Sequence, residues 1–278
     1  MITTETRTFI QSLIDKKKQE LKPSKEERDR VKSIVKYLSD LIYSSIPSSE
    51  IKINFILPQG STGLKDTALR NASDIDLFIG LDISMLPGVN EKSKSQLRNE
   101  IRTLFKNLIT NWLIPLFKEN DLENPVMKYA EHPYISAVYR KMDLDIVFCF
   151  DLSENFLYQR GPLTAVDRTP HHTRYVQDHL SSEQHDEVRV LKFLFQKLHC
   201  YGDKSPVGRS GFLGYIAELF IVKYHSVIGV MENFNDLESK VIFFPPQNQA
   251  LNNPYQNYPI KKVRKKYFPN DFLVIIDP

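Results

Sequence analysis

The sequence has few features that cross-link a chain or direct it into a membrane. It contains only two cysteines, Cys149 and Cys200, and their wide separation argues for a reducing compartment and against a disulfide framework or a four-cysteine zinc site. Residues 1–19 carry charges throughout and lack the apolar stretch of a signal peptide, and no stretch anywhere has about 18 consecutive apolar residues. We therefore expect a cytoplasmic protein with no membrane partner.

Total charge and histidine spacing also fail to identify a partner. The chain has 37 Lys and Arg against 34 Asp and Glu, a net charge of +3, so affinity for nucleic acid depends on where positive charge gathers. Its seven histidines form neither a His-Glu-x-x-His motif nor a paired Cys/His pattern, which argues against zinc. What is present is the composition of a folded protein, 41% apolar and 26% charged, in 278 residues that suit about two domains.

The hydrophobic pattern changes character part-way along the chain. A helix is expected at 4–20, and a capping box at Ser24–Glu27 predicts the start of another. Alternating or β-like apolar runs predict strands at 51–57, 74–81, 126–130, 135–140 and 143–150. Helical spacing predicts helices at 93–118, 173–180, 183–199 and 211–227, followed by an irregular segment at 243–259. We expect an α+β catalytic domain at 1–152 and a mainly helical domain at 153–278.

Paired carboxylates give the first chemical signal. Asp74 and Asp76 are separated by one residue on a predicted strand, so both project from the face opposite Ile75. Adjacent carboxylates repel each other unless a cation lies between them, and Mg²⁺ bound to nucleotide phosphates suits such a pair. The same pattern is also compatible with the solvated face of a half-exposed sheet. Other residues must decide between the two interpretations.

Two further motifs favour the chemical interpretation. Asp143 and Asp145 repeat the pattern on another predicted strand, and so supply candidates for the third carboxylate of a two-metal phosphoryl transfer. Ahead of the first pair, the turn Gly60–Gly63 offers backbone N–H groups and small hydroxyls to phosphates, and Lys65 adds positive charge. Together these motifs predict a metal-dependent nucleotide site.

The segment from Gly60-Ser61 through Asp74-Ile75-Asp76 resembles the signature of the polymerase β-like nucleotidyltransferases. Later motifs narrow the resemblance to the archaeal, class I CCA-adding enzymes, which are tRNA nucleotidyltransferases. These motifs are Glu131–Tyr134, Leu144–Cys149, Thr164–His172, Arg189–Lys192 with Tyr201-Gly202, and Gly211–Leu219. The resemblance implies a nucleotidyltransferase head with a mixed sheet and helices, followed by a mainly helical neck.

The resemblance also implies roles for individual residues. Asp74, Asp76 and Asp145 match the catalytic, metal-binding carboxylates, and Asp145 is expected to help deprotonate the primer 3′-hydroxyl, whereas Asp143 is a neighbour. The positions that match contacts to the nucleotide are Gly60, Ser61, Lys65, His172, Lys192 and Tyr201. The implied reaction adds CMP and AMP from CTP and ATP to the 3′ end of tRNA, or of another RNA. It proceeds by in-line attack on the α-phosphate, with two Mg²⁺ ions as cofactors.

Two features leave the partners open. The basic segment is either a solvated run or a contact to RNA phosphates; it consists of Lys261, Lys262, Arg264, Lys265 and Lys266. The family continues beyond the neck into body and tail domains that grip tRNA, and into a stretch with a base-reading arginine. We therefore expect a fragment, a separate chain that supplies the missing body and tail, or a natural short relative with an altered substrate.

Two other functions remain alternatives. One is an oligoadenylate-synthase-like enzyme, or another small nucleotidyltransferase that uses no tRNA primer. The other is an inactive RNA-binding scaffold, which the presence of all three carboxylates disfavours.

Overall fold

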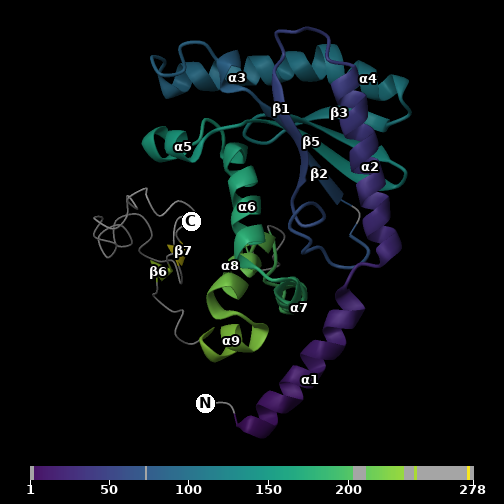
Figure 1. Ribbon diagram of the computed structural model, residues 1–278, viewed down its shortest axis with the longest axis vertical. Helices are drawn as coiled ribbons and strands as arrows, with labels where there is room; N and C mark the ends of the chain where they lie inside the picture. Colours follow the sequence, from purple (N-terminus) through teal and green to yellow (C-terminus); the bar gives the residue numbers. More distant parts are fainter. Residues whose placement is uncertain (1–2, 73, 203–210, 235–240, 243–273, 276–278) are drawn as a thin grey trace. The chain divides into compact units, whose positions relative to one another are not determined.

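The computed structural model describes residues 3–72, 74–202, 211–234, 241–242 and 274–275. Contacts divide the chain into two compact units, whose elements Figure 1 shows. We call Pro23–Thr173 the sheet unit, and Met1–Lys22 together with Arg174–Pro278 the helical unit. The division into domains at 1–152 and 153–278 stays a prediction, because the two units are defined by contacts alone.

The sheet unit is built on a five-stranded mixed sheet. Its strands are β1 (Ile53–Gln59), β2 (Asp74–Leu81), β3 (Glu123–Tyr129), β4 (Pro133–Tyr139) and β5 (Met142–Phe150). They lie in the order β1-β2-β5-β4-β3; β2 and β5 pair in parallel, and the other neighbours are antiparallel. The sequence predicts all five strands. The first starts two residues later than expected and continues to Gln59, so that it ends directly before Gly60.

Helices flank this sheet within the unit. They are α2 (Lys25–Ser44), α3 (Lys94–Leu108), α4 (Ile114–Glu119), α5 (Glu154–Arg160) and α6 (Thr169–His179), of which α6 continues past the end of the unit. The predicted capping box is present, since Ser24 and Glu27 cap each other's backbone at the start of α2. The helix expected at 93–118 is interrupted by a π turn at Ile109–Leu113. A regular helix would bring the ring of Pro115 against the carbonyl four residues earlier, and the wider turn relieves that clash.

The two faces of the sheet have different surroundings. One face is buried with α2 and α3 in the main core, whose fully buried members include Ile34, Leu38, Leu77, Phe105 and Ile146. On the other face, a smaller cluster of Phe78, Val147 and Cys149 is packed against Phe55, Tyr134 and Val166. Because side chains alternate along a strand, positions 74, 76 and 78 of β2 all point to this second face. The second face therefore carries both the acidic motifs and an apolar patch.

A buried carboxylate fixes the segment that leads from the sheet into α6. Asp167 lies in a 3₁₀ turn (Ala165–Arg168) and is fully buried. It accepts hydrogen bonds from the backbone N–H of Phe150 at 2.8 Å and of Thr164 at 2.6 Å. Burial raises the pKa of Asp167 to about 6, although the hydrogen bonds oppose this shift by favouring the ionised form. Asp167 thus joins the end of β5 to the turn before α6.

The helical unit gathers helices from both ends of the chain. Its elements are α1 (Thr4–Leu21), α7 (Ser182–Lys197), α8 (Gly214–Tyr224), α9 (Val227–Glu232) and the paired two-residue strands β6 (Val241–Ile242) and β7 (Val274–Ile275). The helix expected at 211–227 is shorter, because His225 takes a left-handed conformation with φ 67° that ends α8. Ser226 then caps α9 by accepting a hydrogen bond from the N–H of Gly229.

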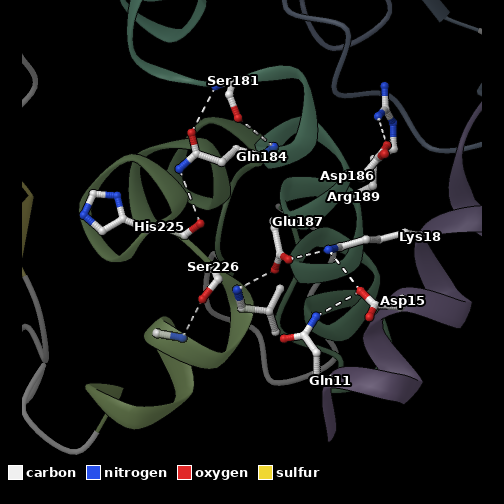
Figure 2. A network of polar contacts seen from close by, with 12 residues as sticks. Gln11, Asp15, Lys18, Ser181, Gln184, Asp186, Glu187, Arg189, His225 and Ser226 are labelled. Atoms are coloured by element: carbon white, nitrogen blue, oxygen red, sulfur yellow. Dashed lines mark hydrogen bonds and ion pairs between the residues drawn. The ribbon is translucent and has the colours of Figure 1, made fainter. Parts of the chain in front are cut away.

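Ion pairs join α1 to the rest of the helical unit. Figure 2 shows Lys18 beside Glu187 of α7, with Nζ and Oε1 2.6 Å apart. The other carboxylate oxygen of Glu187 accepts the N–H of Val227, the first residue of α9, at 2.8 Å. Lys22 and Asp186 form a second pair at 3.2 Å. Because Glu187 is buried, one carboxylate holds three helices together with little screening by solvent.

Some expectations are not addressed by these elements. The irregular segment at 243–259 lies outside the described residues. Among the residues that are described, no helix combines the length and apolar character needed to cross a bilayer.

Replacing Asp167 tests the hydrogen bonds that fix the segment before α6. Asp167→Ala leaves the N–H groups of Phe150 and Thr164 buried without an acceptor, so the free energy of unfolding should fall by about 2–4 kcal/mol. Asp167→Asn keeps one acceptor oxygen and should cost less. Urea denaturation at pH 7.5 measures both variants. The interpretation is wrong if the alanine variant is as stable as the asparagine variant.

Candidate active site

Strand register brings the predicted carboxylates together. In the parallel pair of β2 and β5, Asp74 lies opposite Asp143 and Asp76 lies opposite Asp145. Residues in register on neighbouring strands point to the same face, so all four carboxylates project from one side of the sheet. The two acidic motifs, which are almost 70 residues apart in the sequence, thus form one cluster.

The inner carboxylates belong to a row that crosses all five strands. From β1 to β3, the row consists of Gln59, Asp76, Asp145, Ser136 and Val126. On one side of it, Asp74 and Asp143 extend the acidic cluster. On the other side, Phe78 lies opposite Val147 in the buried apolar patch. Buried apolar side chains therefore border the acidic cluster on one side.

The turn after β1 is built around Asp76. Gly60 has a φ of 69°, and a Cβ at this position would lie 2.3 Å from Oδ2 of Asp76, so only glycine allows the backbone this close. The carbonyl of Ser61 accepts the N–H groups of Thr67 and Ala68, each at 3.0 Å, which closes the loop. The loop is also tied to β2, because Thr62 donates a hydrogen bond to the carbonyl of Asp74 at 2.6 Å.

The charge balance around Asp76 is unfavourable for its ionised form. Burial, followed by the charges of Asp74 and Asp145, raises the pKa of Asp76 from 3.8 to about 6, and Lys65 partly opposes the shift. Lys65 itself is buried, with 6% of its surface exposed. The lysine that the sequence predicts as a phosphate contact therefore also acts electrostatically on Asp76.

The surroundings of Asp145 include two residues that the sequence does not single out. Burial raises the pKa of Asp145, as do the charges of Asp143 and Asp74. A hydrogen bond from Ser136 and the charge of Lys128 act in the opposite direction. Lys128 donates a hydrogen bond to Oγ of Ser136 at 3.0 Å. Only the register of β3, β4 and β5 reveals these residues, because no local motif marks either of them.

The cluster lines an open cavity of about 410 Å³. Its walls include the four carboxylates together with Asn124, Val126, Lys128 and Ser136. Within the described part of the chain, no three His, Cys, Asp or Glu side chains are arranged to hold a metal ion by themselves. Carboxylate oxygens nevertheless suit Mg²⁺, which commonly takes one or two carboxylates and completes its shell with phosphate and water oxygens. The donor set fits a metal that arrives with a nucleotide.

The start of α6 lies beside this row of residues. Thr173 donates a hydrogen bond to the side chain of Gln59 at 2.5 Å, and the ring of His171 contacts the carbonyl of Leu152 at 2.9 Å. The predicted nucleotide contact His172 lies between these two anchored residues and is half-buried. The sheet unit therefore brings together Gly60, Ser61, Lys65 and the carboxylates, with His172 next to an anchored neighbour.

The other predicted nucleotide contacts belong to the helical unit. Lys192 is buried and forms an ion pair with Glu218, with Nζ and Oε1 3.1 Å apart. A Cβ on Gly214 would lie 3.1 Å from the Tyr201 hydroxyl and 3.3 Å from Cε of Lys192, so both side chains lie against this glycine. Lys192 and Tyr201 thus form one polar cluster within their unit. The basic segment at 261–266 lies outside the described residues.

Comparison with known proteins shows what the chain is similar to. The family described as "tRNA nucleotidyltransferase, second domain" matches residues 186–278. The CCA-adding enzyme of Pyrococcus abyssi is 33% identical over 261 residues, and that of Thermococcus gammatolerans is 32% identical over 262 residues. The resemblance to the archaeal CCA-adding enzymes is confirmed. These alignments cover 93% and 94% of this chain but 51% of each relative, so the chain spans about half the length of these relatives.

Solved structures agree on the fold. The CdnC protein of E. coli MS115-1, solved with ATP, has a TM-score of 0.55 and 18% identity, and the match covers 95% of this chain and 80% of that one. The same protein in a complex with HORMA-deltaN has a TM-score of 0.52 and 20% identity, with 94% and 78% covered. The chain shares its fold with these structures, and the α+β class that the sequence predicts is confirmed.

Asp76→Asn tests whether the acidic cluster costs stability. The pKa of Asp76 is raised from 3.8 to about 6, so its ionised form destabilises the folded protein above pH 6, and this cost disappears as the pH falls below 4. In EDTA at pH 8, Asp76→Asn should raise the free energy of unfolding by roughly 1–3 kcal/mol. The gain should vanish at pH 4.

The matched control is Asp143→Asn, which removes a carboxylate of the same cluster that is exposed. It should change the free energy of unfolding by less than about 0.5 kcal/mol. Urea denaturation at both pH values measures each variant. Equal stability of wild type and Asp76→Asn at pH 8 would show that repulsion at Asp76 is negligible.

Proposed function

We propose that this chain transfers nucleotides from CTP and ATP to the 3′ end of tRNA, either in CCA addition or in its repair. The observation that carries the proposal is the register that sets Asp74 and Asp76 beside Asp145, next to the turn at Gly60. Similarity to two archaeal CCA-adding enzymes over more than nine-tenths of the chain supports the choice of tRNA as acceptor. Because the chain spans about half of those relatives, its activity and acceptor must be tested directly.

Asp74, Asp76 and Asp145 are the residues that would hold two Mg²⁺ ions. Burial and the charges of Asp74 and Asp145 raise the pKa of Asp76, and this supports the proposal because a bound cation would stabilise the ionised form. When bound, the ions supply charge neutralisation for an in-line transfer, on the attacking and on the leaving oxygen. Their remaining ligands would be oxygens of the triphosphate and of water.

The side chains of this protein have separate tasks in the proposed reaction. Asp145 helps to take the proton from the primer 3′-hydroxyl as its oxygen bonds to the α-phosphorus. The bond from the α-phosphorus to the β-phosphate oxygen breaks, and pyrophosphate leaves. Gly60 and Ser61 hold the triphosphate through backbone N–H groups and a small hydroxyl, and Lys65 contributes charge.

Further polar residues are proposed as nucleotide contacts, as the resemblance to the CCA-adding enzymes implies. His172, Lys192 and Tyr201 would contact the triphosphate. For Lys192 the support is its burial beside Glu218, because a buried lysine with one defined partner is already oriented. Lys261–Lys266 would contact RNA phosphates, and a separate chain could provide further grip on tRNA. We propose that the reaction takes place in the cytoplasm, because two widely separated cysteines suit a reducing compartment.

Replacing Asp145 tests the central part of the proposal. With Mg²⁺, labelled CTP or ATP and tRNA that lacks its 3′ CCA, Asp145→Asn should lower nucleotide incorporation by at least about 100-fold, because a required carboxylate is lost. Asp143→Asn, on the same strand and face, should retain most of the activity. Equal activity of the two variants would contradict the assignment of Asp145.

The same assay separates the alternative functions. Extension of the tRNA supports the proposed function, whereas products formed without tRNA support an oligoadenylate-synthase-like enzyme. If no product forms and calorimetry detects no Mg²⁺-dependent nucleotide binding, the result favours the alternative of an inactive RNA-binding scaffold.

Gly60→Ala tests the close approach of the turn to Asp76. The added Cβ would lie 2.3 Å from Oδ2 of Asp76 and should displace this carboxylate, so tRNA extension should fall by at least about ten-fold. Gly88→Ala is the matched control, because Gly88 has a φ of 70° but its nearest neighbour would lie 3.6 Å away. Both variants carry the strain of a left-handed alanine, about 1–2 kcal/mol. If both lose activity equally, the contact with Asp76 is not responsible.

A further inference from the structure

We infer that Lys128, acting through Ser136, positions the Asp145 carboxylate for nucleotide transfer. The inference rests on the proposed function, because it concerns a residue to which that function assigns proton transfer. Lys128 and Ser136 belong to β3 and β4, on the side of β5 away from the Gly60 turn. They are positioning residues, since they would act on the reaction only through Asp145.

Strand pairing explains why the three side chains meet. Ser136 of β4 lies opposite Asp145 of β5 on one side and opposite Val126 of β3 on the other. Lys128 is two residues further along β3 than Val126, so it points to the same face and lies diagonally across from Ser136. A long lysine side chain spans such a diagonal, and Nζ of Lys128 is 3.0 Å from Oγ of Ser136.

The chemistry of the three groups sets the direction in which they donate hydrogen bonds. The Lys128 ammonium is only a donor, and an ionised carboxylate such as that of Asp145 is only an acceptor. When the Ser136 hydroxyl accepts from Lys128, its own hydrogen stays available for Asp145, which lies directly opposite Ser136 on the neighbouring strand. Donation therefore runs from Lys128 to Ser136 and from Ser136 to Asp145, and each group restricts the orientation of the next.

The negative charges around Asp145 explain why its carboxylate needs to be held in position. Asp145 lies among Asp74, Asp76 and Asp143, and repulsion favours turning its oxygens away from the cluster. Lys65 acts on the other inner carboxylate, Asp76, from the opposite side of the row. The two inner carboxylates thus have one lysine each. Lys128 is the one that also lines the cavity of the acidic cluster.

A chemically similar group elsewhere in the sheet unit provides a control. Lys52 donates a hydrogen bond to Oγ of Ser84 at 3.3 Å, and the N–H of Ser84 donates to Asp82 at 2.8 Å. These are the same three residue types, with an exposed lysine in both cases, but none of them lines the cavity of the acidic cluster. An effect of Lys128 that Lys52 does not share is therefore specific to the site.

Steady-state kinetics with the 278-residue protein test the link from Lys128 through Ser136 to Asp145. Lys128→Met and Ser136→Ala should each lower kcat for tRNA extension by about ten-fold, the effect of one hydrogen bond to a charged group. The KM for the nucleotide should stay within about two-fold of the wild-type value, because Lys128 and Ser136 lie on the side of β5 away from the turn at Gly60. Lys128→Arg should restore part of kcat, and Lys52→Met should leave it unchanged.

The double variant tests whether Lys128 acts through Ser136. The kcat of the double variant Lys128→Met/Ser136→Ala should be no lower than that of the slower single variant, because either change breaks the same link to Asp145. Two independent effects would instead multiply to about 100-fold. Multiplied effects, an unchanged kcat in Lys128→Met, or an equal loss in Lys52→Met would each overturn the inference.

A spectroscopic measurement separates this inference from the proposed function. In protein labelled with ¹³C at the aspartate carboxyls, without metal and at fixed pH, the Asp145 resonance is identified by its loss in Asp145→Asn. It should shift in Lys128→Met and Ser136→Ala but not in Lys52→Met. If the wild-type protein extends no RNA, the proposed function fails, while this shift still reports the link from Lys128 through Ser136 to Asp145. If wild type is active and the resonance does not move, the inference fails alone.

Discussion

The parallel pairing of β2 with β5 is the constraint on which the candidate site depends. This pairing sets Asp76 opposite Asp145 and Asp74 opposite Asp143, against the repulsion of four like charges. What holds the register is the other face of the same strands, where Leu77 and other apolar residues are fully buried. A slip by one residue would bring the carboxylates into that core. Hydrophobic burial on one face therefore enforces an electrostatically costly arrangement on the other.

The surroundings of the carboxylates reduce this cost without removing it. Lys65 acts on Asp76 from one side of the row, and Lys128 acts on Asp145 from the other. The pKa of Asp76 still stands at about 6, because burial and the charges of Asp74 and Asp145 outweigh the effect of Lys65. A site that was fully neutralised by its own lysines would have little affinity for a cation. The remaining negative charge suits the Mg²⁺ ions of the proposed function.

Polar groups also organise the helical unit, but there they are paired. Glu187 satisfies both Lys18 of α1 and the backbone N–H of Val227, and Lys192 is buried against Glu218. Such buried pairs specify geometry more than they add stability, because desolvation offsets much of the Coulomb attraction. The contrast with the acidic cluster is physical: the pairs hold helices in place, whereas Lys65 and Lys128 compensate the four carboxylates only in part.

Much of this protein follows from local sequence. Each strand has its own apolar pattern, Ser24 and Glu27 mark the start of α2, and the motifs around Gly60 and Asp74, together with later ones, carry the resemblance to the CCA-adding enzymes. Other features were not accessible from hydrophobic periodicity because they depend on local backbone conformation. The π turn before Pro115 and the end of α8 at His225 depend on backbone geometry that periodicity does not encode.

The sequence by itself determined which carboxylates are present and that each pair shares one face of a strand, since side chains alternate along any strand. Tertiary structure decided which strands are neighbours. That order set Asp145 between Asp76 and Ser136, brought Lys128 within hydrogen-bonding distance of Ser136, and joined α1 to α7. Asp76 and Asp145 are 69 positions apart, and Lys18 and Glu187 are 169 positions apart. Ser136 is close in sequence to Lys128 and Asp145, but these side chains meet only when β3, β4 and β5 pair in this register. No local pattern specifies such contacts, because they exist only when the core of the whole unit has formed.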